Sequence, residues 1–366
     1  MSKRNLFSII IGLLPVSYIL GTLVLNINIS LIVICGIFLF FKGNRLKITQ
    51  IDKLVFLFFF YILITSIWNT VEQNYFSNSI NKSYYILSKS IFFLRYLFLY
   101  ITIRLLMSKK LIDFKIIFYI FSITTLCVSI DIIFQFFVGY NVFGYVSPYT
   151  HKNTGLFFDE AIAGGFIQRF SLFIFFTFIA FSNIKNNTTR IYALSLLFLI
   201  TITSIIFSGN RMPLILFMLS IFLILITYKT LKRYLIQILI FMFVISLITI
   251  NSNSRLKQYY QTFYNQSEKI ISLYSYRITG VGSDLIYKNR PYYIHEFDAG
   301  ISTFKLNKYF GGGIKSFRFN CPKVFVNCNI HPHNYYIEIL ADLGLIGFFF
   351  ILYIFVYVFY KGVSRK

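Results

Sequence analysis

Apolar stretches of about 20 residues recur along almost the whole 366-residue chain, with short polar segments between them. A transmembrane helix needs a run of this kind, and a continuous run differs from the alternating pattern of a transmembrane β-barrel strand. The pattern therefore predicts an all-α, polytopic integral membrane protein with about ten transmembrane helices. The predicted spans are residues 6–25, 28–41, 54–69, 84–106, 116–139, 161–182, 191–208, 212–228, 234–250 and 338–360.

Two of the polar segments are long. Residues 140–160 end in two acids, and residues 251–332 form a large outer loop that is rich in Tyr, Asn, Ser and Arg. A loop of that length is usually functional, and this one is expected to contain short helices. The predicted parts of the chain are therefore transmembrane helices one to nine (1–250), the large loop (251–332), and a signature segment with the final transmembrane helix (333–366).

The 35 basic residues outnumber the 12 acidic residues and give a net charge of +23. This charge could indicate a nucleic-acid partner, but most Lys and Arg lie at the ends of predicted spans, which argues for a role in membrane orientation and against nucleic acid. If Lys3 and Arg4 are cytoplasmic, the basic clusters fall on the cytoplasmic side and both termini lie inside. The first apolar stretch has no clear cleavage site and is expected to be a signal anchor.

Some ionisable residues fall inside predicted spans, where charge is costly and functional roles are common. Lys89, Arg95 and Arg104 lie in the fourth span and Asp131 in the fifth. Arg95 and Asp131 fall at similar depth, so an ion pair between them is expected. Arg104 is expected to extend to the inner interface.

Candidate chemistry begins with Asp159 and Glu160, which precede the sixth span. Two carboxylates near a helix N-terminus interact favourably with the helix dipole, which is a sufficient structural explanation. The functional alternative makes Glu160 an acid/base or acceptor-binding group. Arg169 lies about two turns further along and could reach the same cavity.

A second candidate is Arg211, which follows the turn residues Ser208-Gly209-Asn210. It departs from the positive-inside pattern and lies near a predicted helix N-terminus, where a cation is unfavourable. A guanidinium beside free helix amides suits a phosphate, so we expect an anion to bind here. The alternative is an arginine that anchors the helix at the membrane interface.

The third candidate is the segment His331-Pro332-His333-Asn334, just before the last span. Pro332 restricts the segment to an extended form, and Asn334 is placed to cap the following helix. Two histidines could bind zinc, but no third ligand has suitable spacing, so no metal is predicted. Imidazole titrates near neutral pH, which favours a general base. The alternative is a pair of surface histidines at a helix cap.

The four cysteines divide into two pairs. Cys35 and Cys127 lie in apolar segments, where they are expected to pack without reacting. Cys321 and Cys328 lie in the large loop and would form a disulfide if that loop faces an oxidising compartment. Otherwise they remain free thiols. The loop's basic, Tyr-rich composition suits anionic lipid head groups or phosphate-linked glycans.

Three segments resemble the O-antigen ligase and Wzy-type polymerase superfamily of bacterial envelope glycosyltransferases. They are Gly155–Gly164, the turn Ser208–Arg211, and a C-terminal signature that includes Gly311-Gly312-Gly313, His331-Pro332-His333-Asn334-Tyr335-Tyr336-Ile337-Glu338 and Gly344-Leu345-Ile346-Gly347. The resemblance covers about the C-terminal two-thirds of the chain. Family members often have about twelve spans, and a third arginine is expected in the outer loop, for which Arg290 and Arg318 are candidates.

The resemblance implies a metal-independent glycosyltransferase without a cofactor, at the periplasmic face of the bacterial inner membrane. The donor would be a glycan on undecaprenyl diphosphate, and the acceptor would be lipid A-core for a ligase or a growing lipid-linked glycan for a Wzy-type polymerase. Membrane lipids are the other expected partners. Catalytic roles fall to His333, Arg211 and Glu160, and substrate-binding roles to Arg169, His331, Asn334, Arg290 and Arg318. A lipid-linked glycan transporter, with Lys89, Arg95 and Asp131 along its pathway, is the alternative from another class.

Overall fold

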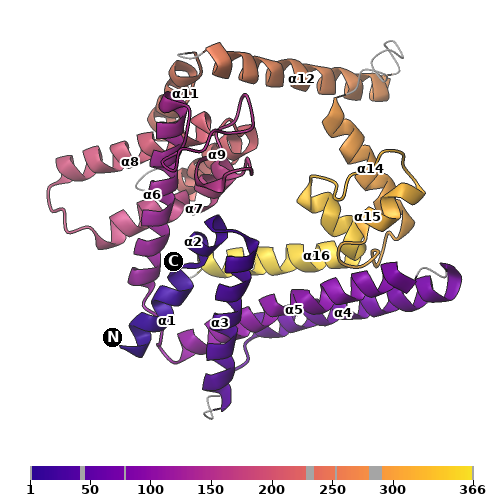
Figure 1. The fold of residues 1–366 in the computed structure, drawn as a ribbon. Helices are drawn as coiled ribbons and strands as arrows, with labels where there is room; N and C mark the ends of the chain where they lie inside the picture. The colour runs from indigo at the N-terminus through magenta and orange to yellow at the C-terminus, as the bar shows by residue number, and fades with distance from the viewer. Residues whose placement is uncertain are drawn as a thin grey trace. The chain divides into compact units, whose positions relative to one another are not determined.

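The computed structural model describes residues 2–41, 46–77, 80–227, 235–251, 254–279 and 291–364. Within these residues the regular structure is helical, apart from one isolated β-bridge between Tyr140 and Val146. The chain divides into two compact units. Unit 1 contains residues 1–32 and 109–265, and unit 2 contains residues 33–108 and 266–366. Figure 1 shows the helices of each unit.

The all-α membrane class is confirmed. Seven of the described helices are long and apolar enough to cross a membrane. The two helices α9 and α11 are also apolar but have only 17 residues each. The seven are α3 (Thr22–Phe41), α4 (Gln50–Ser77), α5 (Ile80–Ser108), α6 (Phe114–Val138), α7 (Ala163–Phe181), α8 (Asn187–Phe207) and α16 (Tyr335–Ser364); the shorter two are α9 (Arg211–Thr227) and α11 (Leu235–Asn251).

Residues 6–25 do not form the single continuous helix that the predicted span implied. Two short helices, α1 (Lys3–Gly12) and α2 (Leu14–Ile19), occupy most of this stretch. Pro15 has no N–H to donate and lies in the first turn of α2, where the missing donor is tolerated. Gly21 then takes a φ of +106° before α3 begins. Hydropathy cannot detect either break, because the residues around both are apolar.

Unit 1 is built around α6, which packs against α7 and α8 (Figure 1). Asp113 caps α6 by accepting a hydrogen bond from the Lys115 amide, and Gly139 ends it in the left-handed conformation at φ +94°. Ser122 on α6 and Thr177 on α7 lie 2.7 Å apart, oxygen to oxygen. The buried apolar core includes Val128, Ile132, Ile167, Ile205 and Phe217.

Unit 2 contains the pair α4 and α5, which run side by side, and α16, which packs on α4 and on α14 (Tyr292–Leu306) (Figure 1). The large loop contains the expected short helices α14, α15 (Phe317–Asn320) and the 3-10 turn η2 (Cys321–Lys323). It also contains α12 (Ser254–Thr279), which has 26 residues and is longer than expected. The division at residues 250 and 332 remains a prediction.

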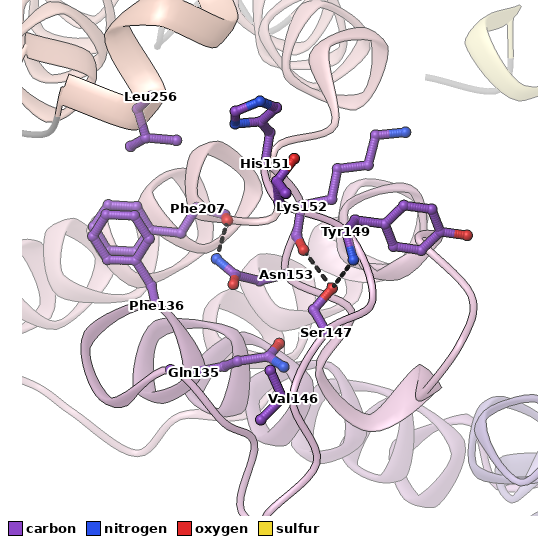
Figure 2. Close-up of a pocket in the computed structure, with 12 residues that line it drawn as sticks. Gln135, Phe136, Val146, Ser147, Tyr149, His151, Lys152, Asn153, Phe207 and Leu256 are labelled. Atoms are coloured by element: carbon purple, nitrogen blue, oxygen red, sulfur yellow. Dashed lines mark hydrogen bonds between the residues drawn. The ribbon is translucent and has the colours of Figure 1, made fainter.

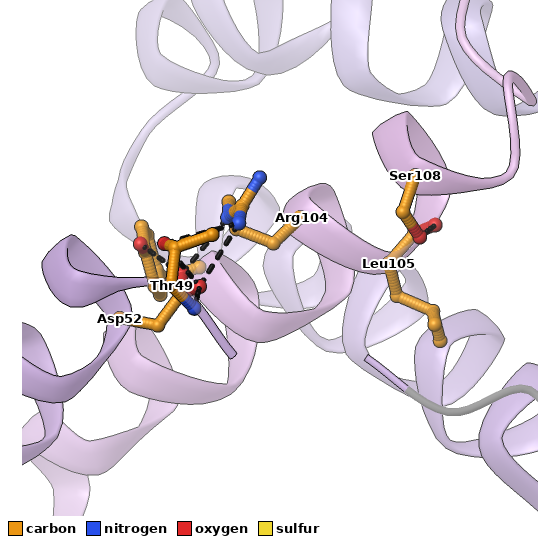
Figure 3. A network of polar contacts seen from close by, with 6 residues as sticks. Thr49, Asp52, Arg104, Leu105 and Ser108 are labelled. Atoms are coloured by element: carbon orange, nitrogen blue, oxygen red, sulfur yellow. Dashed lines mark hydrogen bonds and ion pairs between the residues drawn. The ribbon is translucent and has the colours of Figure 1, made fainter. Parts of the chain in front are cut away.

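One buried ion pair joins α4 to α5 (Figure 3). The Asp52 carboxylate is fully buried and accepts from Arg104 twice, at 2.8 Å from Nε and 2.9 Å from Nη2. The hydroxyls of Tyr100 and Thr49 also donate to it, at 2.5 and 2.6 Å. Arg104 is partly exposed and lies near the end of α5, opposite the first turn of α4. Its expected position at the inner interface remains a prediction.

The ion pair expected between Arg95 and Asp131 remains a prediction, because the two residues lie in different units. Asp131 lies in unit 1, where its carboxylate accepts a hydrogen bond of 2.8 Å from the Val142 amide. Arg95 lies in unit 2, where its Nη2 donates to the Tyr96 hydroxyl at 3.1 Å.

Candidate functional site

The turn between α8 and α9 lies tightly against the loop that follows α6. Gly209 has a φ of +70°, and a Cβ atom added there would lie 2.2 Å from the carbonyl oxygen of His151. Glycine is required both for this conformation and for this close approach. Asn153 also donates from Nδ2 to the Phe207 carbonyl oxygen at 2.7 Å. The turn therefore places Arg211, the first residue of α9, beside this loop.

Arg211 stacks on aromatic side chains of α12. Its guanidinium carbon is 3.8 Å from the centre of the Tyr259 ring and 5.2 Å from that of Phe263. Its Nη2 donates to the Tyr259 carbonyl oxygen at 2.9 Å. Stacking uses the flat face of the guanidinium rather than its in-plane N–H groups, so it orients the group without substituting for an anion. Anion binding at Arg211 remains a prediction.

A cavity of about 290 Å³ lies next to this turn in unit 1 (Figure 2). Its polar lining includes Gln135, His151 and Lys152. Ser147 organises the rim by donating to the Lys152 carbonyl oxygen at 2.6 Å. The His151 ring, which lines the cavity, lies beside Tyr259, with 5.8 Å between ring centres. The cavity is therefore next to the ring on which Arg211 stacks. Such a cavity can take a polar group such as a sugar or a phosphate.

Glu160 and Arg169 are placed less favourably than expected. Glu160 is exposed and precedes α7, which begins only at Ala163. Its neighbour Asp159 accepts a hydrogen bond from the Tyr145 hydroxyl, which raises the pKa of that phenol. Arg169 is exposed on α7. Within the described residues, neither the Glu160 nor the Arg169 side chain forms a hydrogen bond or an ion pair, so their roles remain predictions.

The histidine segment lies in unit 2 at the start of α16. Asn334 caps the helix, because its Oδ1 accepts from the amides of Tyr336 and Ile337 at 3.0 and 3.2 Å. The predicted capping role is therefore confirmed. Pro332 is buried against α14, where a Cβ atom added to Gly300 would lie 3.3 Å from the Pro332 side chain. The segment is thus fixed on both sides of His333.

The two histidines remain exposed and lie close together, with 4.3 Å between ring centres. His333 has a φ of +50°, a left-handed conformation that is uncommon for any residue but glycine and that clusters at functional sites. Desolvation by the surrounding protein, and then the charge of His333, hold the pKa of His331 below its usual value. Neutral imidazole is the form that accepts a proton.

Carboxylates of α16 face the turn before α15. Glu338 forms an ion pair with Lys315, with 2.5 Å between Oε1 and Nζ. Asp342 is buried and accepts from the Lys315 amide at 2.8 Å and from the Ser316 hydroxyl at 3.1 Å. Lys315 is in the left-handed conformation, with a φ of +62°. These contacts attach the turn to the helix that begins with the histidine segment.

The glycines of the C-terminal signature have a structural role. At Gly344 the backbone of α16 leaves the helical conformation, with φ +65° and ψ −170°. The break frees carbonyl groups before it and N–H groups after it, and all such groups need partners in a buried position. A Cβ atom at Gly344 would lie 2.3 Å from the Tyr309 carbonyl oxygen, so the neighbouring loop approaches too closely for any other residue.

The segment 308–313 supplies the missing partners. The amides of Gly312 and Gly313 donate to the carbonyl oxygens of residues 341 and 342, at 3.0 and 2.8 Å. The amides of residues 345 and 346 donate to the carbonyl oxygens of residues 308 and 309, at 2.8 and 3.1 Å. The Gly311-Gly312-Gly313 run therefore completes the hydrogen bonding of a broken membrane helix, just beyond the histidine segment.

Cys321 and Cys328 form a disulfide, which decides between the two alternatives left by the sequence. Cys321 is fully buried and packs with Ala299, Phe317 and Ala341. Disulfides persist in oxidising compartments and are rare in the cytosol. The covalent link closes the loop between α15 and the histidine segment.

The predicted site residues thus fall into two sets, one in each unit. Unit 1 contains Arg211, Glu160 and Arg169, and unit 2 contains His331, His333, Asn334 and Arg318. Arg290 lies outside the described residues. In the part of the chain that the structure describes, no three His, Cys, Asp or Glu side chains gather as a metal site.

Sequence reasoning did not assign three residues that shape these sites. Tyr259 stacks with Arg211 although 48 positions separate them, and no local pattern announces such a contact. No sequence motif marks His151 as a lining residue. Lys315 is one of several cations in the large loop, and the one signal for its contact is Glu338, the acid in the first turn of α16.

Comparison with known proteins gives one match. Residues 196–352 match the family model Wzy_C, which is described as O-Antigen ligase. This segment is less than half of the chain; it includes Arg211, Arg318 and the histidine segment and excludes Glu160 and Arg169. No curated protein and no solved structure matches the chain.

Proposed function

We propose, from the match of residues 196–352 to the O-antigen ligase family model, that the protein transfers a glycan from undecaprenyl diphosphate to a sugar hydroxyl at the periplasmic face of the inner membrane. The proposed acceptor is lipid A-core, which makes the protein a ligase. A Wzy-type polymerase, whose acceptor is another lipid-linked glycan, would use the same residues. The histidine segment at the capped start of α16 is the observation that supports the proposal most directly.

The proposed reaction breaks the bond between C1 of the donor sugar and the diphosphate oxygen, and forms a bond between C1 and the acceptor oxygen. His333 removes the proton of the acceptor hydroxyl, and undecaprenyl diphosphate leaves with the electron pair of the broken bond. The buried Pro332 and the Asn334 cap support this role, because a general base must be held in place. His331, with its lowered pKa, binds substrate as a neutral neighbour.

Arg211 stabilises the negative charge of the departing diphosphate in this proposal. Its stacking on Tyr259 supports the role, since a pre-oriented guanidinium needs no reorganisation when the charge develops. Arg169, or a loop arginine such as Arg290 or Arg318, helps Arg211 to hold the diphosphate. Glu160 orients the acceptor or substitutes as base. No step requires a metal or a nucleotide sugar.

The orientation that the proposal needs has two supports. The disulfide near the histidine segment suits an oxidising compartment, which the periplasm is. The basic residues at the span ends follow the positive-inside rule when both termini are cytoplasmic.

The test is transfer by the purified protein in liposomes, with undecaprenyl-diphosphate glycan and with or without lipid A-core. His333→Ala and Arg211→Ala should each lower the transfer rate by at least ~10²-fold, and His331→Ala should lower it less. Arg190→Ala is the matched arginine control, because Arg190 lies at the other end of α8 and donates to the Ile179 carbonyl oxygen. It should transfer at the wild-type rate.

Product on lipid A-core supports the ligase, and a lengthening ladder on the carrier without that acceptor supports the polymerase. Unchanged transfer by His333→Ala would refute the catalytic role of the histidine. If the wild-type protein transfers no glycan from authentic donor to either acceptor, the transferase proposal fails, and carrier flipping in the same liposomes becomes the next measurement.

A further inference from the structure

A second cavity, in unit 2, is lined by four cations. It has a volume of about 500 Å³ and lies between α5 and the turn that precedes α15. Lys89 and Arg95 line it from α5, and Lys315 and Arg318 line it from the turn and α15. Lys89 and Arg95 belong to the membrane-length part of α5, residues 84–108, where an ionisable side chain is costly and usually functional.

Three of the four cations have aromatic neighbours and no acid. Lys89 Nζ is 4.9 Å and the Arg318 guanidinium carbon 5.1 Å from the centre of the same Tyr85 ring, so these two charges lie within about 10 Å of each other. Arg95 lies 4.9 Å from the Tyr96 ring centre. Among the described residues, none of these three cations forms an ion pair with a carboxylate, whereas Lys315 is paired with Glu338.

Two hydrogen-bond donors behind the cavity lining have no acceptor. The Nε atoms of Arg95 and Arg318 are buried and have no partner among the described residues. Buried donors are almost always satisfied, and an orphaned one needs an explanation. Aromatic contacts attract cations but do not cancel the mutual repulsion of the charges. A bound anion would cancel this repulsion and accept hydrogen bonds from the guanidinium groups that line the cavity.

Part of the cavity lining is apolar, so the ligand needs an apolar portion as well as a charge. Phe92, Phe93 and Ile314 complete the lining, and Phe92 is 63% exposed. Because α5 is a membrane-length helix, its exposed apolar surface faces lipid. A phosphate fits the two guanidinium groups, and a hydrocarbon chain attached to it would extend along the phenylalanines.

We infer that this cavity binds the phosphate group of a membrane lipid. The phosphate could belong to an anionic phospholipid or to a polyprenyl carrier, since both join a phosphate to a long apolar chain. The inference shares Arg318 with the proposed transferase, but its test measures lipid binding and not glycan transfer, so either can fail without the other.

The experiment measures lipid binding to the purified, delipidated protein by native mass spectrometry. The probes are phosphatidylglycerol, undecaprenyl phosphate, and diacylglycerol as the chain-matched lipid without phosphate. At least one phosphate lipid should bind at least ~10-fold more tightly than diacylglycerol, and Arg95→Gln/Arg318→Gln should remove that preference. The preferred probe then identifies the source: phosphatidylglycerol indicates a structural lipid, and undecaprenyl phosphate indicates the carrier.

Lys361→Gln is the control, because Lys361 is a cation beside a tyrosine, 5.9 Å from the Tyr357 ring centre, at the other end of unit 2's long helix. It should retain the wild-type preference. A second readout, the melting temperature of the wild-type protein, should rise with the preferred phosphate lipid and not with diacylglycerol, and it needs no variant. Equal affinity of all three lipids for the wild-type protein, or an unchanged preference in the folded double variant, would overturn the inference.

Discussion

Replacing Gly344 by alanine should destabilise unit 2 severely, because the break in α16 has no room for a side chain. The φ of +65° and ψ of −170° lie in a region almost restricted to glycine, where another residue costs about 1–3 kcal/mol. The added Cβ would also lie 2.3 Å from the Tyr309 oxygen and 2.6 Å from the Gly311 nitrogen. These are backbone atoms, so the loop has to move.

Moving the loop weakens the four backbone hydrogen bonds across the break, each of which contributes about 0.5–1.5 kcal/mol net. With half of them lost, the total destabilisation is roughly 2–6 kcal/mol once the backbone strain is added. For a unit of this size, that corresponds to a fall of roughly 4–24 °C in melting temperature. The buried groups have no water to replace their partners, which favours the upper part of this range.

The assay is thermal unfolding in detergent, followed by the fluorescence of Trp68. It is the only tryptophan in the chain, and it lies on α4, which packs against α16. Gly362→Ala is the matched control on the same helix, because a Cβ there meets no atom within 4 Å. It should be neutral or slightly stabilising, by up to ~1 kcal/mol. A Gly344→Ala protein that melts with the control would refute the reasoning.

Three further predictions concern stability. Asp52→Ala should cost about 3–5 kcal/mol, because it leaves the partly buried Arg104 charge without its carboxylate. A double-mutant cycle by SDS titration should show that Asp52→Ala/Arg104→Ala costs less than the two single changes together, and strict additivity would contradict a direct pair. The pKa of His331 is lowered in the folded state, so protonation of His331 favours the unfolded state. As the pH drops below about 6.5, the melting temperature of the wild type should therefore fall more than that of His331→Ala. Parallel pH profiles of the two proteins would contradict this. Removing the disulfide with Cys321→Ser/Cys328→Ser should cost about 2–3 kcal/mol relative to the oxidised wild type, because the closed loop is short. Wild-type stability in the double variant would show that the bond does not constrain the unfolded chain.

Much of the membrane architecture could be predicted from the hydrophobic pattern. Six of the predicted spans correspond to the long helices α4 to α8 and α16, because a run of about 20 apolar residues has few stable alternatives in a bilayer. The pattern failed over residues 6–25, where Pro15 and Gly21 interrupt the helix without changing the hydropathy. It also missed the break at Gly344, since one glycine in an apolar run is common in membrane helices.

The features of the candidate site that depend on neighbouring residues could be predicted from the sequence. The Asn334 cap and the tight turn before Arg211 follow from a few adjacent residues, whose backbone preferences act without the rest of the fold. The contact partners of those residues could not be predicted from the sequence. Tyr259 beside Arg211 and Lys315 beside Glu338 come from other segments, and depth along a helix does not specify which neighbour a side chain faces.

The sequence by itself thus determined that the chain is a polytopic helical membrane protein, where its helices are capped and turned, and which few polar residues stand out against the apolar background. Only the tertiary structure decided how the Gly311–Gly313 run completes the broken helix, that Arg104 pairs with Asp52, and that Lys89, Arg95 and Arg318 share one cavity. The physical reason is the range of the interactions. Backbone hydrogen bonds, caps and membrane burial depend on neighbouring residues, whereas ion pairs and cavities depend on which helices meet, and helix packing alone specifies that.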